Sequence, residues 1–539
     1  MNLVLIETSG NQAYIFATNK LRENVGASEL TAQVGRQFVL DAVQAAKGQR
    51  PQDLRKPDTY PALSDTNAVE VILAVSGKAL LLVRDAAIGR QIVNKVTLRA
   101  LREAPGLEVR GVVSREFDFE KDALHPLIGE IHREYEVVRS RLPGPVARFQ
   151  RLPIIAECAS SGLPAMRVAT EADGLAKEER KEYSAQTFAK LRARKDWETR
   201  RDEILQRHVV HAKLPNATTA LEKLGCDWLA IVHADGNGLG QVFLKFDEYV
   251  KPHIPEGSDQ RTQNRIYIQK LRTFSLALDA CTEKAFCQAL SVLRPRRNSE
   301  SNSITPIVPL VLGGDDLTVV CDGRQALQFT KKFIDCFEQE TREHQHIKPI
   351  MQNGVTSCAG VAIVKPHFPF FAGYQLAEEL LKSAKKLKPL SAIDYHILYD
   401  ASGPDLDRIR DELTVDGGQT RLVGRPYAVT AEKGPVNRHW SDLQRRIEAV
   451  RARDDDDRRR LPNSMLHELR EGLFLGRAAA DARLRLVLER YRQSGLAELL
   501  GDSSNGGSLF WKDTDGHRTA LLDAIDTADF WEAKEKDQA

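Results

Sequence analysis

The sequence has few cysteines for its length, and their spacing is irregular. Its 539 residues include 7 Cys, and no Cys-x-x-Cys pattern occurs. An odd number of scattered cysteines argues against a disulfide framework and predicts a reducing environment, the cytoplasm. A structural zinc site needs about four clustered Cys or His ligands, so no zinc is expected.

Long apolar runs and an excess of one charge are also lacking. No stretch approaches the ~18 apolar residues of a membrane span, and the N-terminus has no signal-peptide pattern. We therefore expect no membrane partner. The 77 Lys plus Arg against 75 Asp plus Glu give a net charge of +2. That balance excludes a surface that is positively charged throughout and binds nucleic acid everywhere, but it does not exclude a local basic groove.

Several common catalytic signatures are missing as well. The chain contains no His-Asp dipeptide, no Gly-x-Ser-x-Gly elbow and no Gly-x-x-x-x-Gly-Lys-[Ser/Thr] loop. An HD-type metal nuclease, an α/β-hydrolase and a P-loop NTPase therefore find no support. With 42% hydrophobic and 28% charged residues, the chain has the composition of a folded protein of three or four domains.

Two parts of the chain share one order of expected elements, β-α-β-β-α-β, which is the ferredoxin-like order of an α+β fold. Short Val-, Ile- and Leu-rich runs predict the strands, and the mixed segments between them predict helices. We call residues 1–115 the first unit, with strands expected at 3–7, 69–75, 79–83 and 108–113 and helices at about 19–47 and 86–104. Residues 216–400 are the second unit, with strands expected at 228–234, 307–312, 317–321 and 356–364 and helices at 266–293, 325–344 and 374–388. The repetition predicts an internal duplication.

The other two regions have a simpler pattern. Residues 116–215 are charged and predict a mostly helical connecting region, and residues 401–539 predict a helical C-terminal domain. Cys158–Ala165 has the outline of a remnant zinc knuckle, with Ser161 where a second Cys would stand. A surface turn set by Gly162 is the plainer interpretation.

Three carboxylates of the second unit are expected to converge. Its first strand ends in Asp235-Gly-Asn-Gly, and its central hairpin turns at Gly313-Gly-Asp-Asp316. The first and second strands should be parallel, with the third antiparallel between them, so the strand end and the hairpin tip lie at one edge. Asp235, Asp315 and Asp316 would repel one another unless cations pair with them.

This acid cluster is typical of a two-metal nucleotidyltransferase site that holds Mg²⁺ or Mn²⁺. Glycines beside the acids would let the backbone approach a nucleotide and turn amides toward its phosphates. Two lysines near the end of the last helix are candidates for phosphate contact. The nucleotide-binding candidates that this reasoning gives are Gly236, Gly238, Gly313, Gly314, Lys382 and Lys385. His233, inside the strand, is expected to be a packed or hydrogen-bonded side chain.

The first unit lacks the corresponding acids. Aligning Gly10 with Gly236 places Ser9 where Asp235 stands. The hairpin of the first unit carries Ser76-Gly-Lys78 in place of the Gly-Gly-Asp-Asp sequence. This copy cannot hold two metals, although Ser76, Gly77 and Lys78 could contact a nucleotide placed between the units. We predict a pseudo-symmetric pair with one active centre.

These motifs resemble a known family, the large polymerase-like subunit of type III CRISPR effector complexes. The resemblance rests on the Ile6–Phe16 and Lys20–Ser28 segments of the first unit and, in the second, on His233–Gly240, Gly313–Asp316, Cys358–Val364 and Ala377–Leu381. It implies two palm domains, the second of them catalytic.

In that family the second palm converts ATP to cyclic oligoadenylates, which act as defence messengers. The resemblance implies ATP as substrate, metals on Asp235, Asp315 and Asp316, and Lys385 as a phosphate contact. It also implies that Asn237, with Gly313 and Gly314, lies along the nucleotide. It also implies guide-RNA effector proteins and target RNA as partners. Many members begin with an HD nuclease domain, whereas this chain starts at the first palm, and the family's four-cysteine knuckle survives only as Cys158.

Other functions stay open at this point. A standalone cyclic nucleotide synthase of another defence system fits the same residues. A diguanylate-cyclase-like enzyme using GTP is a second alternative, although Asp316-Leu317 does not match the hairpin ending of such palms. A non-catalytic RNA-binding scaffold is a third, but the candidate strands offer only Trp228 for base stacking.

Overall fold

The structure is a computed structural model, and it describes most of the chain. The described residues are 1–141, 152–170, 173, 180–215, 218–297, 301–399, 403, 405–430, 434–454, 456–490, 496–502 and 507–531. None of the helices in these ranges combines the length and the hydropathy that a bilayer crossing requires.

The first unit is a four-stranded antiparallel sheet of order β2-β3-β1-β4. Apolar side chains cover both faces of its central strands, which is why β1 and β3 are almost wholly buried. The strands are β1 (Asn2–Ser9), β2 (Val69–Val75), β3 (Lys78–Val83) and β4 (Glu108–Val113). The helices are α1 (Asn11–Ile15), α2 (Leu21–Gln33), α3 (Val39–Ala45) and α4 (Ala86–Glu103). The expected strand order is confirmed.

The helix predicted over about 19–47 is present from Leu21 to Ala45, but its middle is not α-helical. A π-helical turn, Val34–Phe38, joins α2 to α3. Within it, Gly35 lies against the β2–β3 hairpin, where an added Cβ would be 2.9 Å from the backbone nitrogen of Lys78. A π turn redirects the side chains around it and often marks a functional position. Arg36 is one of the residues redirected here.

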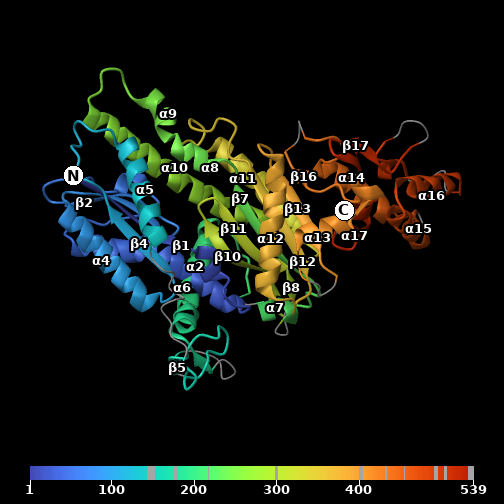
Figure 1. Ribbon diagram of the computed structural model, residues 1–539, viewed down its shortest axis with the longest axis horizontal. Helices are drawn as coiled ribbons and strands as arrows, with labels where there is room; N and C mark the ends of the chain where they lie inside the picture. The colour runs from blue at the N-terminus through green and yellow to red at the C-terminus, as the bar shows by residue number, and fades with distance from the viewer. Residues whose placement is uncertain are drawn as a thin grey trace.

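The connecting region is built on two long helices, as expected, but also contains a short two-stranded sheet. Helix α5 (Leu124–Arg141) covers the sheet of the first unit, and α6 (Ala185–Arg207) packs along α2 (Figure 1). Ser184 caps α6 by accepting a hydrogen bond from the Thr187 N–H. The remaining elements are β5 (Arg167–Val168), β6 (Glu182–Tyr183) and α7 (Thr218–Lys223).

The second unit repeats the four-stranded core and extends it. Its sheet has the order β10-β11-β7-β12-β13-β16, in which the first four strands match the first unit and the last two are additional. The strands are β7 (Leu229–Gly236), β10 (Ile307–Gly313), β11 (Asp316–Asp322), β12 (Ser357–Val364), β13 (Ala392–Ile397) and β16 (Tyr427–Ala428). The helices are α8 (Leu239–Leu244), α9 (Phe246–Val250), α10 (Gln260–Ala289), α11 (Ala326–Glu343) and α12 (Phe370–Ala384), and β8 (Arg296–Arg297) and β9 (Ser303–Ile304) form a separate pair.

The strand directions are those expected. Strand β11 is antiparallel to both β10 and β7 and lies between them, so β10 and β7 are parallel. Strand β12 flanks β7 on the other side. The end of β7 and the tip of the β10–β11 hairpin therefore share one edge of the sheet.

The C-terminal region is not purely helical, contrary to the expectation. Its described part contains a small sheet of order β14-β15-β18-β17, and β16 joins the sheet of the second unit. These strands are only two or three residues long, too short for a hydrophobic alternation to be visible in the sequence. The elements are α13 (Leu406–Glu412), β14 (Thr414–Val415), β15 (Thr420–Arg421), α14 (Trp440–Arg451), α15 (Asn463–Phe474), α16 (Arg477–Arg490), β17 (Trp511–Asp513), β18 (Gly516–Arg518) and α17 (Leu521–Ala528).

The two units lie side by side, with α10 of the second unit crossing to the first (Figure 1). Arg272 of α10 donates hydrogen bonds to the carbonyls of Val71, at 2.8 Å, and Ile72, at 3.3 Å, on the outer strand β2. It also pairs with the buried Glu70. A buried carboxylate is stable only when it is paired, so this contact joins the two units firmly.

Candidate functional site

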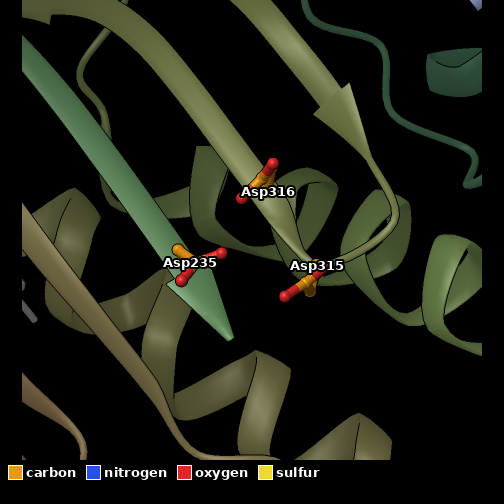
Figure 2. Close-up of side chains that lie close together, drawn as sticks. All are labelled: Asp235, Asp315 and Asp316. Atoms are coloured by element: carbon orange, nitrogen blue, oxygen red, sulfur yellow. The ribbon is translucent and has the colours of Figure 1, made fainter. Parts of the chain in front are cut away.

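The three predicted aspartates come together at the shared edge of the second sheet. Asp235 is the next-to-last residue of β7, Asp315 lies in the hairpin turn, and Asp316 begins β11. Their carboxylate oxygens lie within 4.8 Å of one another, and all three residues are half-buried. Figure 2 shows them between the end of β7 and the hairpin tip. The described residues contain no other group of three or more potential metal ligands.

Glycine makes this close approach possible. An added Cβ at Gly236 would lie 2.9 Å from both the Cβ and Oδ2 of Asp315, so a larger residue would push the hairpin away from the strand. Gly314 has a φ of 63°, in the left-handed region that disfavours other residues. The glycines thus shape the hairpin and bring its acids to Asp235.

The electrostatics of the cluster favour a bound cation. Burial, and then the charge of Asp315, raise the pKa of Asp316 to about 8. Burial also raises the pKa of Asp315. Both shifts mean that the ionised carboxylates are short of compensating charge. Three oxygen donors in this state suit Mg²⁺ or Mn²⁺, which prefer carboxylate ligands.

Lys385 lies at the cluster, whereas Lys382 does not. The Lys385 ammonium forms an ion pair with Asp235, and burial, followed by the charge of Lys388, lowers its pKa to about 8. Lys382 instead pairs with Glu378 at 2.8 Å and its side chain is 68% exposed. Helix α12 ends at Ala384 and Lys385 begins a 3₁₀ turn, so the two lysines diverge.

Asn237 is turned into the protein rather than along an open surface. Its side-chain amide donates hydrogen bonds to Thr356 Oγ1 at 3.1 Å, Cys358 Sγ at 3.3 Å and the Leu390 carbonyl at 3.3 Å. Its backbone N–H donates to the Thr356 carbonyl at 2.7 Å. These contacts of the amide nitrogen fix the end of β7 against β12, and the contact of Asn237 with a nucleotide stays a prediction.

The other predicted glycines have distinct places. Gly236 pairs with Ser357 in the sheet, and Gly238, with a φ of 78°, opens α8. The backbone N–H and carbonyl of Gly314 form hydrogen bonds with side chains of α10. We expected these backbone groups to face a ligand, and in this structure they face α10. Gly313 lines the cavity described next.

A cavity of about 120 Å³ lies between the units, beside the acid cluster. The second unit contributes Gly313, Asp316 and Tyr374 to its wall, and α6 contributes Arg200. The first unit contributes neutral side chains, of which five are polar and three are apolar: Asn11, Gln12, Ser28, Thr31 and Ser76, and Ile15, Phe16 and Ala32. Ser76 thus lies in the cavity wall next to the β10–β11 hairpin, where an added Cβ at Gly313 would be 3.1 Å from its Oγ.

Arg200 was missed by sequence reasoning. It donates to the Leu312 carbonyl at 3.3 Å and pairs with Glu29 at 3.4 Å. Burial lowers the pKa of its guanidinium, as does the nearby Arg36. The helix around it is rich in Arg and Lys, so nothing in the sequence singles this residue out.

His233 is a packed residue, as predicted. Its Nδ1 lies 3.0 Å from Thr318 Oγ1, and burial lowers the pKa of its imidazole to about 4. The neutral ring packs against Tyr374, with ring centroids 5.4 Å apart. Trp228, the aromatic considered for base stacking, packs edge-on against Tyr399 and Phe530 instead.

In the first unit, the position equivalent to Asp235 carries a different network. Ser9 donates a hydrogen bond to Glu108 at 2.7 Å and accepts one from Arg110 at 2.6 Å. Lys78 turns away from the cavity toward Glu7, at 3.3 Å, and His132, at 2.9 Å. Lys78 is therefore already paired and does not line the cavity, and its contact with a nucleotide stays a prediction.

The remnant knuckle is filled with hydroxyl groups. Cys158 Sγ lies 3.4 Å from Thr187 Oγ1, which is 3.4 Å from Ser161 Oγ and 3.2 Å from Ser184 Oγ. The pairs Cys158–Ser161 and Ser184–Thr187 each have the two-residue spacing of a metal knuckle. Hydrogen bonds thus join Cys158 and Ser161 to Ser184 and Thr187 at the start of α6.

Comparison with known proteins identifies one part of the chain. Residues 228–391 match the family model "Cas10/Cmr2, second palm domain". This segment is similar to a Cas10-type second palm. The family resemblance inferred from the sequence is thereby confirmed, and the matched segment contains all three aspartates and Lys385. A search of curated proteins found no match.

Solved structures show the same fold over nearly the whole chain. The chain is similar to a Csm1–Csm4 cassette in complex with one ATP, with a TM-score of 0.52, 12% identity, and 98% of this chain and 70% of that chain covered. A Csm1–Csm4 cassette in complex with cA3 gives a TM-score of 0.50, 13% identity, and coverages of 91% and 65%. At these identities the likeness concerns the fold. The chain thus spans about two thirds of the length of these relatives.

Proposed function

We propose that the protein is a metal-dependent nucleotidyltransferase that joins ATP into cyclic oligoadenylates. The observation that carries this proposal is the cluster of Asp235, Asp315 and Asp316 beside a cavity between two palm-like units. The similar cassettes in complex with one ATP and with cA3 support the choice of substrate and product. The neutral amides and hydroxyls of the first unit suit a base or ribose better than a phosphate.

The reaction joins two nucleotides by one exchange of bonds. The 3′-hydroxyl oxygen of one nucleotide bonds to the α-phosphorus of the next, the bond from that phosphorus to pyrophosphate breaks, and the hydroxyl proton passes to solvent. Closing the ring repeats this step within one oligonucleotide. The cavity of about 120 Å³ is too small to enclose a nucleotide, so the two nucleotides would extend from it onto the surfaces of both units. Binding them side by side there removes much of the entropic cost of their meeting.

The residues present fit a metal site. Asp235, Asp315 and Asp316 would hold Mg²⁺ or Mn²⁺, because their oxygens are close together and short of compensating charge. Bound metal would stabilise negative charge on the attacking and leaving oxygens. Asn237 fixes the strand that carries Asp235, and Gly236 leaves room for Asp315.

Lys385 and Arg200 supply positive charge at two sides of the site. Lys385 pairs with Asp235. When metal binds this carboxylate, the flexible Lys385 side chain can move and pair with a phosphate of the nucleotide instead. Arg200 is held rigidly beside the hairpin, where a planar guanidinium can bind phosphate oxygens. The proposal therefore includes phosphate contacts of both Lys385 and Arg200.

We also propose an assembly and a compartment. The similar cassettes pair Csm1 with Csm4, which supports a partner protein of an RNA-guided effector, with guide and target RNA as further partners. All seven cysteines are free and buried, which suits a reducing cytoplasm.

Incubation of the purified protein with ATP and Mg²⁺ or Mn²⁺, with and without co-purifying partners and RNA, tests the proposal. Ion-exchange chromatography and mass spectrometry should detect pyrophosphate and cyclic oligoadenylates. GTP in a parallel reaction separates this activity from that of a diguanylate cyclase. Absence of product from both nucleotides under all of these conditions would leave the RNA-binding scaffold as the better interpretation.

A further inference from the structure

The tip of the catalytic hairpin is held by two side chains of α10. The Gly314 N–H donates a hydrogen bond to Asp279 Oδ1 at 2.9 Å, and the Gly314 carbonyl accepts one from Thr282 Oγ1 at 2.5 Å. Asp279 and Thr282 are three residues apart, so they share one face of the helix. Both backbone groups of the residue that precedes Asp315 are therefore fixed from α10.

The second oxygen of Asp279 reaches the first unit. Asp279 Oδ2 pairs with Arg36 Nη2 at 3.1 Å. Arg36 lies in the π-helical turn Val34–Phe38, which departs from the α-helical spacing on either side. The Asp279 side chain is 11% exposed and that of Arg36 is 21% exposed, so the pair is largely shielded from solvent. One carboxylate thus contacts the hairpin and the first unit together.

The space around this carboxylate is tightly filled. An added Cβ at Gly313 would lie 3.0 Å from Asp279 Oδ1 and 3.1 Å from Ser76 Oγ. The hairpin of the second unit is therefore confined between α10 and the hairpin of the first unit. A shift of the Asp279 side chain would therefore move Gly314. Asp315 and Asp316 follow Gly314 directly in the chain, so they would move with it.

We propose that Asp279 is a positioning residue that sets the geometry of the hairpin acids from the first unit, through Arg36. This inference rests on the proposed function, because it concerns the same reaction. Loss of the negative charge breaks the pair with Arg36 and weakens the hold on the Gly314 N–H, since charge-assisted hydrogen bonds are about twice as strong as neutral ones. A misplacement of about 1 Å can cost about 100-fold in rate.

Glu283 offers a matched control. It lies four residues after Asp279 on α10 and also pairs with the first unit, through Arg55 at 3.5 Å, and with Arg207 of α6. No contact joins it to the hairpin among the described residues. Asp279→Asn and Glu283→Gln are both isosteric and both remove one buried negative charge from the same helix face.

Steady-state kinetics with ATP and Mn²⁺ test the positioning. Asp279→Asn should lower kcat by about 10- to 100-fold and change KM for ATP by less than about twofold, with a higher Mn²⁺ concentration for half-maximal rate. Arg36→Met should lower kcat less, and should have no further effect in the Asp279→Asn background. Glu283→Gln should keep the wild-type kcat. Equal losses of kcat in Asp279→Asn and Glu283→Gln would overturn the proposal.

Hydrogen exchange of peptides covering residues 310–320 provides a readout that needs no turnover. Asp279→Asn should speed exchange of these amides, and Glu283→Gln should not. Unchanged exchange in Asp279→Asn contradicts the proposal, as does faster exchange with an unchanged kcat. If the wild-type protein makes no product, the proposed function is contradicted instead. The hydrogen-exchange data alone then test whether Asp279 fixes the hairpin.

Discussion

The first and second units share a four-stranded core but treat charge at the same edge in opposite ways. In the second unit, three carboxylates lie within 4.8 Å of one another and Lys385 is their cation. In the first, Ser9 lies between Glu108 and Arg110, and Lys78 pairs with Glu7. Charges are neutralised in one copy and left in excess in the other. The fold tolerates both arrangements, so the proposed chemistry would depend on these few side chains.

The units also differ at their outer edges. Strand β12 of the second unit is extended by β13 and β16, whereas β4 of the first unit pairs only with β1 within the described residues. Their inner sides face each other and line the cavity. The duplication thus supplies one unit that carries the acids and another that closes the site against them.

The largest expected effect on activity comes from removing the carboxylates that the second unit has and the first unit lacks. Asp315→Asn with Asp316→Asn should lower pyrophosphate release by about 1,000-fold or more, because the metal ligands are lost while the side-chain volumes are kept. Circular dichroism should show an unchanged fold. Asp335→Asn, an exposed aspartate on α11 that pairs with Lys331, serves as the control. Activity that survived the double substitution would show that the chemistry lies elsewhere.

The lysine pair on α12 and its 3₁₀ turn gives the next effect. Lys385→Ala should lower kcat/KM for ATP by about 10-fold, because the one cation that pairs with Asp235 is removed. Lys382→Ala should stay within about twofold of wild type, since that side chain is exposed and pairs with Glu378. Initial rates over a range of ATP concentrations measure both. Equal losses for the two variants would contradict the assignment.

Stability should depend on pH through the second unit. Burial and Asp315 raise the pKa of Asp316 to about 8, far above its value in an unfolded chain. Between about pH 4 and pH 8 the folded state therefore binds a proton that the unfolded state has released, and the free energy of unfolding falls as pH rises. This loss should be complete above about pH 8.

Thermal unfolding in EDTA measures this dependence. Asp316→Asn should raise Tm at pH 8 by about 2–6 °C over wild type and leave it unchanged at pH 4. Added Mn²⁺ should narrow the difference at pH 8 because it stabilises only the wild-type carboxylates. A difference in Tm that did not change with pH would assign the stabilisation to packing rather than to charge.

The smallest effect concerns the first unit. Ser76 lines the cavity and has a φ of 41°, so Ser76→Gly removes the hydroxyl without backbone strain. We expect KM for ATP to rise by about two- to fivefold with kcat unchanged, because one polar contact is worth about 1 kcal/mol. Ser64→Gly, in a turn away from the cavity, should match wild type. A loss of kcat in Ser76→Gly would instead place Ser76 in the chemical step.

The sequence predicted the repeated core well, for a local reason. Val69–Val75 and Glu108–Val113 are strands with the bounds expected, because short segments rich in valine and bounded by glycine- or polar-rich turns favour strands. The strands β13 to β18 were missed. Strands β14 to β18 depend on pairing with distant segments, as in β15 with β18, and their two or three residues carry no pattern of their own. Strand β13, with six residues, was long enough to be predicted.

By itself, the sequence determined which residues carry the acids and that two similar units exist. Strand order follows from connection rules, so Asp235 and the hairpin had to share an edge. Only the tertiary structure decided which side chains face that edge. Asn237 and Lys78 turn elsewhere, Lys385 separates from Lys382 at the end of a helix, and Asp279 with Arg36 reaches the hairpin from other elements. Helix ends and close packing over long sequence separations set these directions, and no local pattern encodes them.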